Sequence, residues 1–450
     1  MEPKKGKENE LGTESVGKLL FRLSMPAIAA QVINVMYNMV DRMYIGHIPG
    51  VGAAALTGVG VTMPVIMAIT AFAYFISMGG APRSSIMLGR NEKDKAEKIL
   101  GNCTTMLVVL ALILTAVFLV FGRSILLLFG ASENTIGYAW DYMKIYALGT
   151  IFVQLALGLN AFITAQGYAK TSMYTVLIGA VCNIILDPIF ILPWGLNMGA
   201  AGAGLATFLS NCVACIYFFV LLYVRRKNTF VCILPKKFSM QKAVVLGVCG
   251  VGIPAAIQNL LNVTGMTILN NFTSSYGAQA VAAMGISQKI NMVPMQVAMG
   301  FSQGIMPLIS YSYASGNHKR MKETVIFAVR TLLPFLIVVS LGYYFGAGTL
   351  IRSFMNNESI IAYGTRFLRG FCLGLSFLCM DFLAVGVFQA VGMGRAALSF
   401  AILRKIVLEI PALYVLNRLF PLYGLAYAQF TAEFVLAIAA VFMLCRIFRK

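Results

Sequence analysis

About twelve long apolar runs, separated by short polar connections, are the feature that most constrains how this chain folds. Each run approaches or exceeds the roughly 20 residues that an α-helix needs to cross the hydrocarbon core of a membrane. The composition agrees, because 59% of the 450 residues are hydrophobic and only 11% are charged, too few for a water-facing surface. We therefore expect an all-α integral membrane protein with helices near residues 17–46, 52–80, 95–121, 134–165, 170–192, 199–224, 244–274, 279–312, 322–346, 359–392, 397–418 and 422–446.

The positive charges predict how these helices are oriented. The formal net charge is +19, and most lysines and arginines fall at the termini and in every second connection. Such basic connections are expected on the cytoplasmic side of a membrane. The pattern predicts that both termini are cytoplasmic in a plasma (inner) membrane, and it assigns the charge to topology, with no nucleic-acid partner. The polar first 18 residues lack the apolar core of a signal peptide, so the first helix is expected to act as the insertion signal.

The chain also repeats itself. The segment MPAIAAQVINVMY at 25–37 resembles IPAAIQNLLNVTG at 253–265, and Pro26 aligns with Pro254. Similar pairs continue through both halves, with a spacing that falls from 228 to 222 residues. Halves that start on the same side of the membrane are parallel repeats, an arrangement that transporters build around a substrate site. We expect a six-helix bundle at 1–224, a cytoplasmic linker at 225–243 and a second six-helix bundle at 244–450.

Acidic side chains within apolar runs are the main candidates for function, because they are costly in a membrane and usually face a cavity or a partner. In the first helix, Gln31, Asn34, Asn38 and Asp41 are spaced by three, four and three residues and therefore share one face. Tyr37 lies beside this polar stripe. The stripe predicts that Asn38 and Asp41 belong to a buried polar site.

A second acidic residue lies in the fifth helix. Asn183 and Asp187 are four residues apart on one face, and Pro188 removes a backbone hydrogen bond next to the carboxylate. Thr207 in the sixth helix offers a hydroxyl to the same group. Two carboxylates with amide and hydroxyl oxygens suit Na⁺ or a shared proton. A purely structural role, in which Asp187 braces a proline-broken helix, is the alternative reading of the same residues.

The second half keeps this position but changes its surroundings. Glu409 matches Asp187, and Glu433 matches Asn211. Lys405 lies four residues before Glu409 and is expected to neutralise it by an i,i+4 pair. No role is assigned to Glu409, to Glu433 or to Lys289 of the eighth helix. The first half therefore resembles an ion site, and the second half resembles the wall of a substrate site.

The candidate substrate wall combines flexible, polarizable methionines with amides and one acid. Met292 and Met295 recur at helical spacing in the eighth helix, although any single methionine can equally be ordinary core filler. Asp381 lies near the middle of the tenth helix. The residues that we expect to contact substrate are Gln258, Asn262, Gln288, Met292, Met295 and Asp381.

Motifs of several catalytic classes are missing from the sequence. It contains no GxxxxGK[ST] phosphate loop and no HExxH motif, and its two histidines, His47 and His318, lie near connections. The nine cysteines are scattered through apolar runs and indicate no disulfide framework. We expect no enzymatic activity and no cofactor apart from a coupling ion.

Taken together, these residues resemble the multidrug and toxic compound extrusion (MATE) family over nearly the whole chain. The likeness rests on MPAIAAQVINVMYNMVDRMYIG, on NIILDPIF followed by GAAGAGLATFLSN, and on GISQKINMVPMQVAMGFSQGIMPLISYSYASGN. The resemblance implies an exporter of cationic, lipophilic compounds that is driven by inward Na⁺ or H⁺. In the branch with an acidic first helix, it places the ion site on Tyr37, Asp41, Asn160, Asn183, Asp187 and Thr207. Another branch uses acids of the seventh and tenth helices, but the seventh helix here contains none.

We therefore expect a secondary active multidrug antiporter that exports cationic drugs or dyes by rocker-switch alternating access, acting as a monomer in the lipid bilayer. Pro26 and Pro188 are the expected hinges of the first and fifth helices. The alternative is a flippase for a lipid or polysaccharide precursor with a related fold. We disfavour it because the mid-span basic residues that the sequence reveals are few, namely Arg42 and Lys289. An intramembrane enzyme and a passive channel are also disfavoured, because no catalytic constellation and no ring-like repeat is visible.

Overall fold

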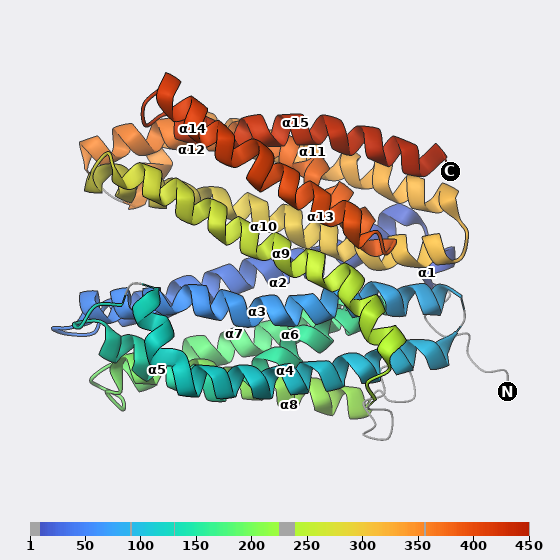
Figure 1. The fold of residues 1–450 in the computed structure, drawn as a ribbon, viewed down its shortest axis with the longest axis horizontal. Helices are drawn as coiled ribbons and strands as arrows, with labels where there is room; N and C mark the ends of the chain where they lie inside the picture. Colours follow the sequence, from blue (N-terminus) through green and yellow to red (C-terminus); the bar gives the residue numbers. More distant parts are fainter. Residues whose placement is uncertain (1–9, 91, 130, 225–238, 355–356, 450) are drawn as a thin grey trace. The chain divides into compact units, whose positions relative to one another are not determined.

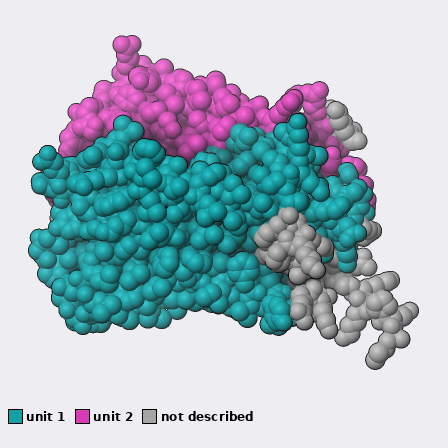
Figure 2. All heavy atoms as spheres, turned by 60° about the horizontal axis from the view of Figure 1, so that its bottom comes forward, with its two compact units in different colours: residues 1–13, 29–256 teal, residues 14–28, 257–450 magenta. Residues whose placement is uncertain are grey.

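The computed structural model describes residues 10–90, 92–129, 131–224, 239–354 and 357–449, and the regular secondary structure within these ranges is helical (Figure 1). The chain divides into two compact units, which Figure 2 shows in different colours. Unit 1 holds residues 1–13 and 29–256, and unit 2 holds residues 14–28 and 257–450.

Unit 1 is built mainly from helices of the first half. They are α1 (Glu10–Thr13), most of α2 (Val16–Gly46), α3 (Gly52–Gly89), α4 (Lys93–Leu128), α5 (Ile136–Leu148), α6 (Thr150–Ala165), α7 (Ala169–Ile191) and α8 (Gly199–Val224). Helix α7 packs along α8, and α6 packs against α3, α4, α7 and α8. Lipid is as apolar as leucine, so such packing depends on close van der Waals contact, which small residues permit. Gly158 of α6, for example, lies directly against Leu107 of α4.

Unit 2 is built mainly from helices of the second half. They are most of α9 (Lys242–Ser274), α10 (Ala278–Ala314), α11 (His318–Phe354), α12 (Glu358–Ala390), α13 (Gly394–Ile402), the π-helix η3 (Leu403–Glu409), α14 (Ile410–Leu419) and α15 (Gly424–Arg449). Helix α12 is central, because it packs against α10, α11, α13 and α15. Its side chains Phe367, Leu368, Leu378 and Phe388 are completely buried.

The helices have the length and surface of membrane spans. Ten of the described helices are long and apolar enough to cross a membrane, and α5 with α6 forms an eleventh span if this bent pair is counted as one. Outward-facing side chains are strongly apolar, with Val120, Phe345 and Leu128 between 72% and 84% exposed. Such a surface is stable in lipid and not in water. The predicted all-α integral membrane fold with two repeated halves is confirmed.

Two of the expected helices are interrupted. The range 134–165 bends by 58° between α5 and α6, at Gly149, whose missing side chain leaves room for Phe208 of α8. The range 397–418 consists of α13, η3 and α14, so the eleventh expected span contains a π-helical segment with buried Arg404, Lys405 and Glu409. Kinks at glycine and π-helical segments are recognised causes of irregular helices, and the latter are frequent at functional sites.

The repeat is visible at the level of single turns. Gly167 is the second residue after the end of α6, with φ at 87°, and Gly392 is the second residue after the end of α12, with φ at 80°. Both occupy the left-handed region that glycine adopts without steric cost. The two turns therefore reverse the chain by the same local device at corresponding places in the two halves.

Each unit also contains a helix segment from the opposite half of the sequence. Residues 14–28 of α2 belong to unit 2, and residues 242–256 of α9 belong to unit 1. The crossing points lie two residues beyond Pro26 and two residues beyond Pro254, which the repeat aligns. In the predicted linker 225–243, residues 225–238 lie outside the described ranges, and the predicted bundle boundaries stay a prediction.

Candidate functional site

The polar stripe of α2 ends at a buried carboxylate. Asp41 is 8% exposed, and its Oδ1 has no hydrogen-bond partner among the described residues. The neighbouring Arg42 influences Asp41 electrostatically, but the two form no ion pair in the described part of the chain. Asn38 donates its amide to the backbone oxygen of Asn34 at 2.6 Å, so this side chain is engaged within its own helix. Its predicted part in ion binding stays a prediction.

The pair on α7 is arranged as its spacing indicates. Asn183 and Asp187 are 1% and 0% exposed, and Asn183 Nδ2 donates to Asp187 Oδ1 at 3.3 Å. Asn183 Oδ1 and Asp187 Oδ2 have no partner among the described residues. The helix continues beyond Pro188 and ends at Ile191, where the amide of Leu192 donates to the Pro188 oxygen at 3.3 Å. The unpartnered oxygens of Asn183 and Asp187 therefore lie within the last three turns of α7.

Helices α6 and α8 supply two further predicted residues. Asn160 of α6 donates its amide to the Ser172 oxygen at 3.2 Å, while its buried Oδ1 has no partner in the described structure. Thr207 of α8 is 8% exposed and forms a side-chain hydrogen bond with Tyr142. Tyr142 was not singled out from the sequence, because it lies in α5, away from any polar stripe. Its ring stacks on Tyr146, one turn further along α5.

Electrostatic interactions connect these residues within unit 1. Asp187 interacts with Asp41, and Tyr37 interacts with both carboxylates. Tyr142 interacts with Asp41 and Tyr37 as well. We call this set the Asp41–Asp187 cluster, and it comprises Tyr37, Asp41, Tyr142, Asn160, Asn183, Asp187 and Thr207.

The free atoms of the cluster are all oxygens. Asp41, Asn160, Asn183 and Asp187 each contribute one buried oxygen that has no hydrogen-bond donor among the described residues. Buried polar atoms normally have partners, so four free oxygens in one cluster need an explanation. Carboxylate, amide and hydroxyl oxygens are the ligands that hard cations prefer. The arrangement can therefore accept a monovalent cation or a proton.

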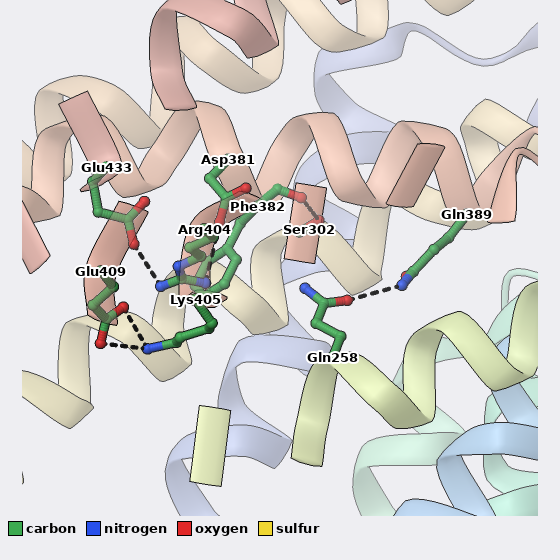
Figure 3. A network of polar contacts seen from close by, with 9 residues as sticks. All are labelled: Gln258, Ser302, Asp381, Phe382, Gln389, Arg404, Lys405, Glu409 and Glu433. Atoms are coloured by element: carbon green, nitrogen blue, oxygen red, sulfur yellow. Dashed lines mark hydrogen bonds and ion pairs between the residues drawn. The ribbon is translucent and has the colours of Figure 1, made fainter. Parts of the chain in front are cut away.

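The predicted substrate residues lie in unit 2 and are less tightly connected. Gln258 accepts a hydrogen bond from Gln389 at 3.4 Å (Figure 3), and Gln288 donates to Asn270 at 3.3 Å. Met292 is 42% exposed. Asn262 is partly buried. The contacts found in the described ranges do not join these side chains into one site, and their binding of substrate stays a prediction.

Met295 and Asp381 are engaged inside unit 2. Met295 packs against buried side chains of α12, including Leu375 and Leu378, and its sulfur accepts the Asn291 amide at 3.7 Å. Asp381 is 1% exposed and forms an ion pair with Arg404 at 3.1 Å. Substrate contact by either residue stays a prediction.

More basic residues lie within the spans than the sequence indicated. It counted Arg42 and Lys289, yet Arg404 and Lys405 are also buried within a span, at 3% and 8% exposure. Both are ion-paired with carboxylates of unit 2. They are therefore already engaged and are not free to bind an anionic headgroup.

The family is decided by a comparison with known protein families. A family model described as MatE matches the chain twice, over residues 26–189 and 254–415. The chain belongs to the MatE family. The two matches begin at Pro26 and Pro254, so the repeat recognised in the sequence is the repeat of the MatE family.

Relatives of similar length extend the comparison over the whole chain. A multidrug export protein, MepA, from Staphylococcus haemolyticus is 32% identical over 430 residues, which cover 95% of this chain and 93% of the relative. MepA from Staphylococcus saprophyticus is 29% identical over 428 residues, with the same coverage of both chains. The resemblance inferred from sequence motifs is confirmed.

Solved structures share the MatE fold. An outward-facing multidrug resistance MATE family transporter of the MOP superfamily is 22% identical, with a TM-score of 0.92 over 99% of both chains. A MOP superfamily transporter from Pyrococcus furiosus, whose binding pocket is described as having reversed polarity, is also 22% identical, with a TM-score of 0.92 over the full length of both chains. At these identities the likeness concerns the fold.

Proposed function

We propose that this MatE family member is a secondary active multidrug antiporter, which exports cationic lipophilic compounds in exchange for Na⁺ or H⁺. The closely matching relatives are named multidrug export proteins, and the composition requires a membrane environment. The charge distribution supports a plasma membrane location with both termini cytoplasmic. Rocker-switch alternating access of a monomer is the mechanism that we propose for transport.

The observation that carries the proposal is the set of four unpartnered oxygens in the Asp41–Asp187 cluster. No lysine or arginine forms an ion pair with Asp41 or Asp187 in the described residues, so neither carboxylate has a directly bound counter-charge there. Buried carboxylates require compensation. A cation taken from the medium supplies it, and its arrival and departure change the charge of unit 1 by one.

This change of charge can drive export. An empty cluster leaves two carboxylates that repel each other, whereas a bound cation draws Asp41 of α2 and Asp187 of α7 together. Helix α2 contains Pro26 and α7 contains Pro188, and proline removes a backbone hydrogen bond at each position. We propose that cation binding changes the bend of these helices and thereby favours release of the drug.

Transport by purified protein in liposomes tests the proposal. Ethidium movement would be measured with a pH gradient alone, a sodium gradient alone, or neither, for the unchanged protein and for an Asp41→Asn, Asp187→Asn double variant. We expect the unchanged protein to require one of the two gradients, which identifies the coupling ion. The double variant should lose gradient-driven transport, because the two amides carry no negative charge to attract Na⁺ and take up no proton near neutral pH.

A matched control is Asp141→Asn. Asp141 pairs with Lys144 at 2.6 Å in the middle of α5 and is almost half exposed, so its loss should leave coupling unchanged. Gradient-driven export that survives in the double variant would contradict the proposed cation site. Ethidium movement that ignores both gradients would contradict antiport itself.

A further inference from the structure

Unit 2 contains a second buried set of charged groups, drawn from three helical elements, of which α15 packs against both of the others. Asp381 lies on α12, Arg404, Lys405 and Glu409 lie on η3, and Glu433 lies on α15 (Figure 3). All five are between 0% and 8% exposed. We call this set the Arg404 network. It shares no residue with the Asp41–Asp187 cluster.

The contacts within the network are ion pairs. Arg404 Nη1 lies 3.1 Å from Asp381 Oδ2, and Arg404 Nη2 lies 2.5 Å from Glu433 Oε1. Lys405 Nζ donates to both oxygens of Glu409, at 2.8 and 2.6 Å. The Arg404 guanidinium also lies 5.5 Å from the centre of the Phe382 ring. Arg404 therefore bridges α12 and α15, while Lys405 forms its ion pair with Glu409 of its own element.

The π-helical turn explains how these groups meet. In a regular α-helix, neighbouring residues point about 100° apart, so Arg404 and Lys405 would not both face the interior. The wider i→i+5 turn of η3 changes this relation, and both side chains are buried. The π-helical turn thus coincides with the two adjacent basic residues of the network.

The charges of the network do not balance. Three carboxyl groups, Asp381, Glu409 and Glu433, face two bases, Arg404 and Lys405. If every group is ionised, the network carries one uncompensated negative charge in a water-poor interior, which is strongly unfavourable. Helix α9 meets the network at Gly265, where an added Cβ would lie 3.1 Å from Lys405 Nζ and 3.4 Å from Glu409 Oε1.

Two buried carboxyl oxygens are the candidate positions for the missing positive charge. Asp381 Oδ1 and Glu433 Oε2 are buried, and neither has a hydrogen-bond partner in the described part of the chain. Each lies on a carboxyl group whose other oxygen already pairs with Arg404. Glu409, in contrast, has both oxygens bonded to Lys405.

We propose that the Arg404 network is a second cation-binding site and that its ligand is one proton, held on Asp381 or Glu433. A proton bonds to a single carboxyl oxygen and needs no extra space, whereas a metal ion would have to share these carboxylates with the Arg404 guanidinium. The proton comes from the medium and adds to a carboxylate, which becomes a neutral carboxylic acid. The network then holds two negative and two positive charges.

Infrared spectroscopy tests this proposal without any transport measurement. The absorption of protonated carboxyl groups would be recorded near neutral pH in an Asp41→Asn, Asp187→Asn background, which removes the carboxyl groups of the other cluster. We expect one protonated-carboxyl absorption in this background. Adding either Glu433→Gln or Asp381→Asn should abolish it, because two carboxylates then remain for two bases. Adding Asp141→Asn should leave it unchanged.

Several results would overturn the proposal. They are the absence of the absorption in the background, its persistence in both added variants, or its loss when Na⁺ is added at constant pH, which would make sodium the missing charge. Failure of both Glu433→Gln and Asp381→Asn to fold would also overturn it, since removal of the surplus carboxylate is expected to be tolerated. None of these results depends on the proposed antiport, so the two proposals can fail separately.

Discussion

The Asp41–Asp187 cluster and the Arg404 network include positions that the internal repeat aligns. They differ in how the negative charge of their buried carboxylates is compensated. Asn183, Asp187 and Asn211 of unit 1 correspond to Lys405, Glu409 and Glu433 of unit 2, each 222 positions later. In both units the residue four positions before the acid bonds to it, an amide in unit 1 and a lysine in unit 2. Unit 2 therefore supplies most of its counter-charge from within, whereas our proposal for unit 1 takes the counter-charge from the medium.

The residue four positions before the buried acid determines how the negative charge of that acid can be compensated. An amide beside a buried acid leaves the negative charge available to an exchangeable cation, while a base beside it fixes the charge in a permanent ion pair. The two arrangements differ at one position, which is Asn183 in unit 1 and Lys405 in unit 2.

Removal of the central base of unit 2 should have the largest effect. Arg404→Gln leaves Asp381 and Glu433 buried without a positive partner, and breaking a buried pair in this way costs about 3–5 kcal/mol. We expect a loss of stability of this size in thermal or denaturant unfolding of the purified protein. Arg418→Gln, at an exposed position near the end of α14, is the matched control and should change little. Equal stability of the two variants would show that the network is not ion-paired.

Introducing into unit 1 the lysine that unit 2 has before its buried acid tests the difference between the two units directly. Asn183→Lys places a base four residues before Asp187, as Lys405 lies before Glu409. The new ammonium competes with the exchangeable cation, and we expect its affinity to fall about 10- to 100-fold, as for lost support of a bound metal ion. The measurement is the cation concentration for half-maximal ethidium export.

Asn183→Gln is the control for that experiment, because it lengthens the side chain without adding charge. It should weaken cation binding less than Asn183→Lys does. If both variants behave alike, the geometry of Asn183 matters more than the charge at this position. The amide-versus-base distinction between the two units would then be abandoned.

The sequence predicted the local pairs of both units but not their larger connections. The i,i+4 spacing placed Asn183 beside Asp187 and Lys405 beside Glu409, because helical geometry alone decides such contacts. Arg404 was missed because an ordinary α-helical period does not turn it inward beside Lys405. Tyr142 was missed because its contact with Thr207 joins α5 to α8, near the bend at Gly149.

In the fold, too, local features were predictable from the sequence and contacts between distant segments were not. Apolar length and the distribution of charge predicted the spans, since both follow from the bilayer. The exchange of residues 14–28 and 242–256 between the units was not predicted. It depends on packing between helices that are distant in sequence, for which the apolar pattern carries no signal.

The exchanged segment of α2 provides the next prediction. It packs on α10, where a Cβ on Gly304 would lie 2.5 Å from the Cα of Ser24. Gly304→Ala therefore forces backbone to move, and overpacking of this kind costs about 1–3 kcal/mol in unfolding. Gly285→Ala, in the same helix but with open space around it, is the control and should be neutral or slightly stabilising. Equal stability of the Gly304 and Gly285 variants would mean that α2 is not held tightly on α10.

The smallest expected effect concerns Tyr142, which links Thr207 to the carboxylates of unit 1. Tyr142→Phe removes the hydroxyl and keeps the ring that stacks on Tyr146, so packing is preserved. A single neutral hydrogen bond contributes about 0.5–1.5 kcal/mol, and we expect cation affinity in the export assay to weaken by the corresponding factor. Tyr138→Phe, one turn earlier in α5, is the matched control. Unchanged cation affinity in Tyr142→Phe would remove Tyr142 from the Asp41–Asp187 cluster. A loss as large as that of Asn183→Lys would instead make the hydroxyl a direct ligand of the cation.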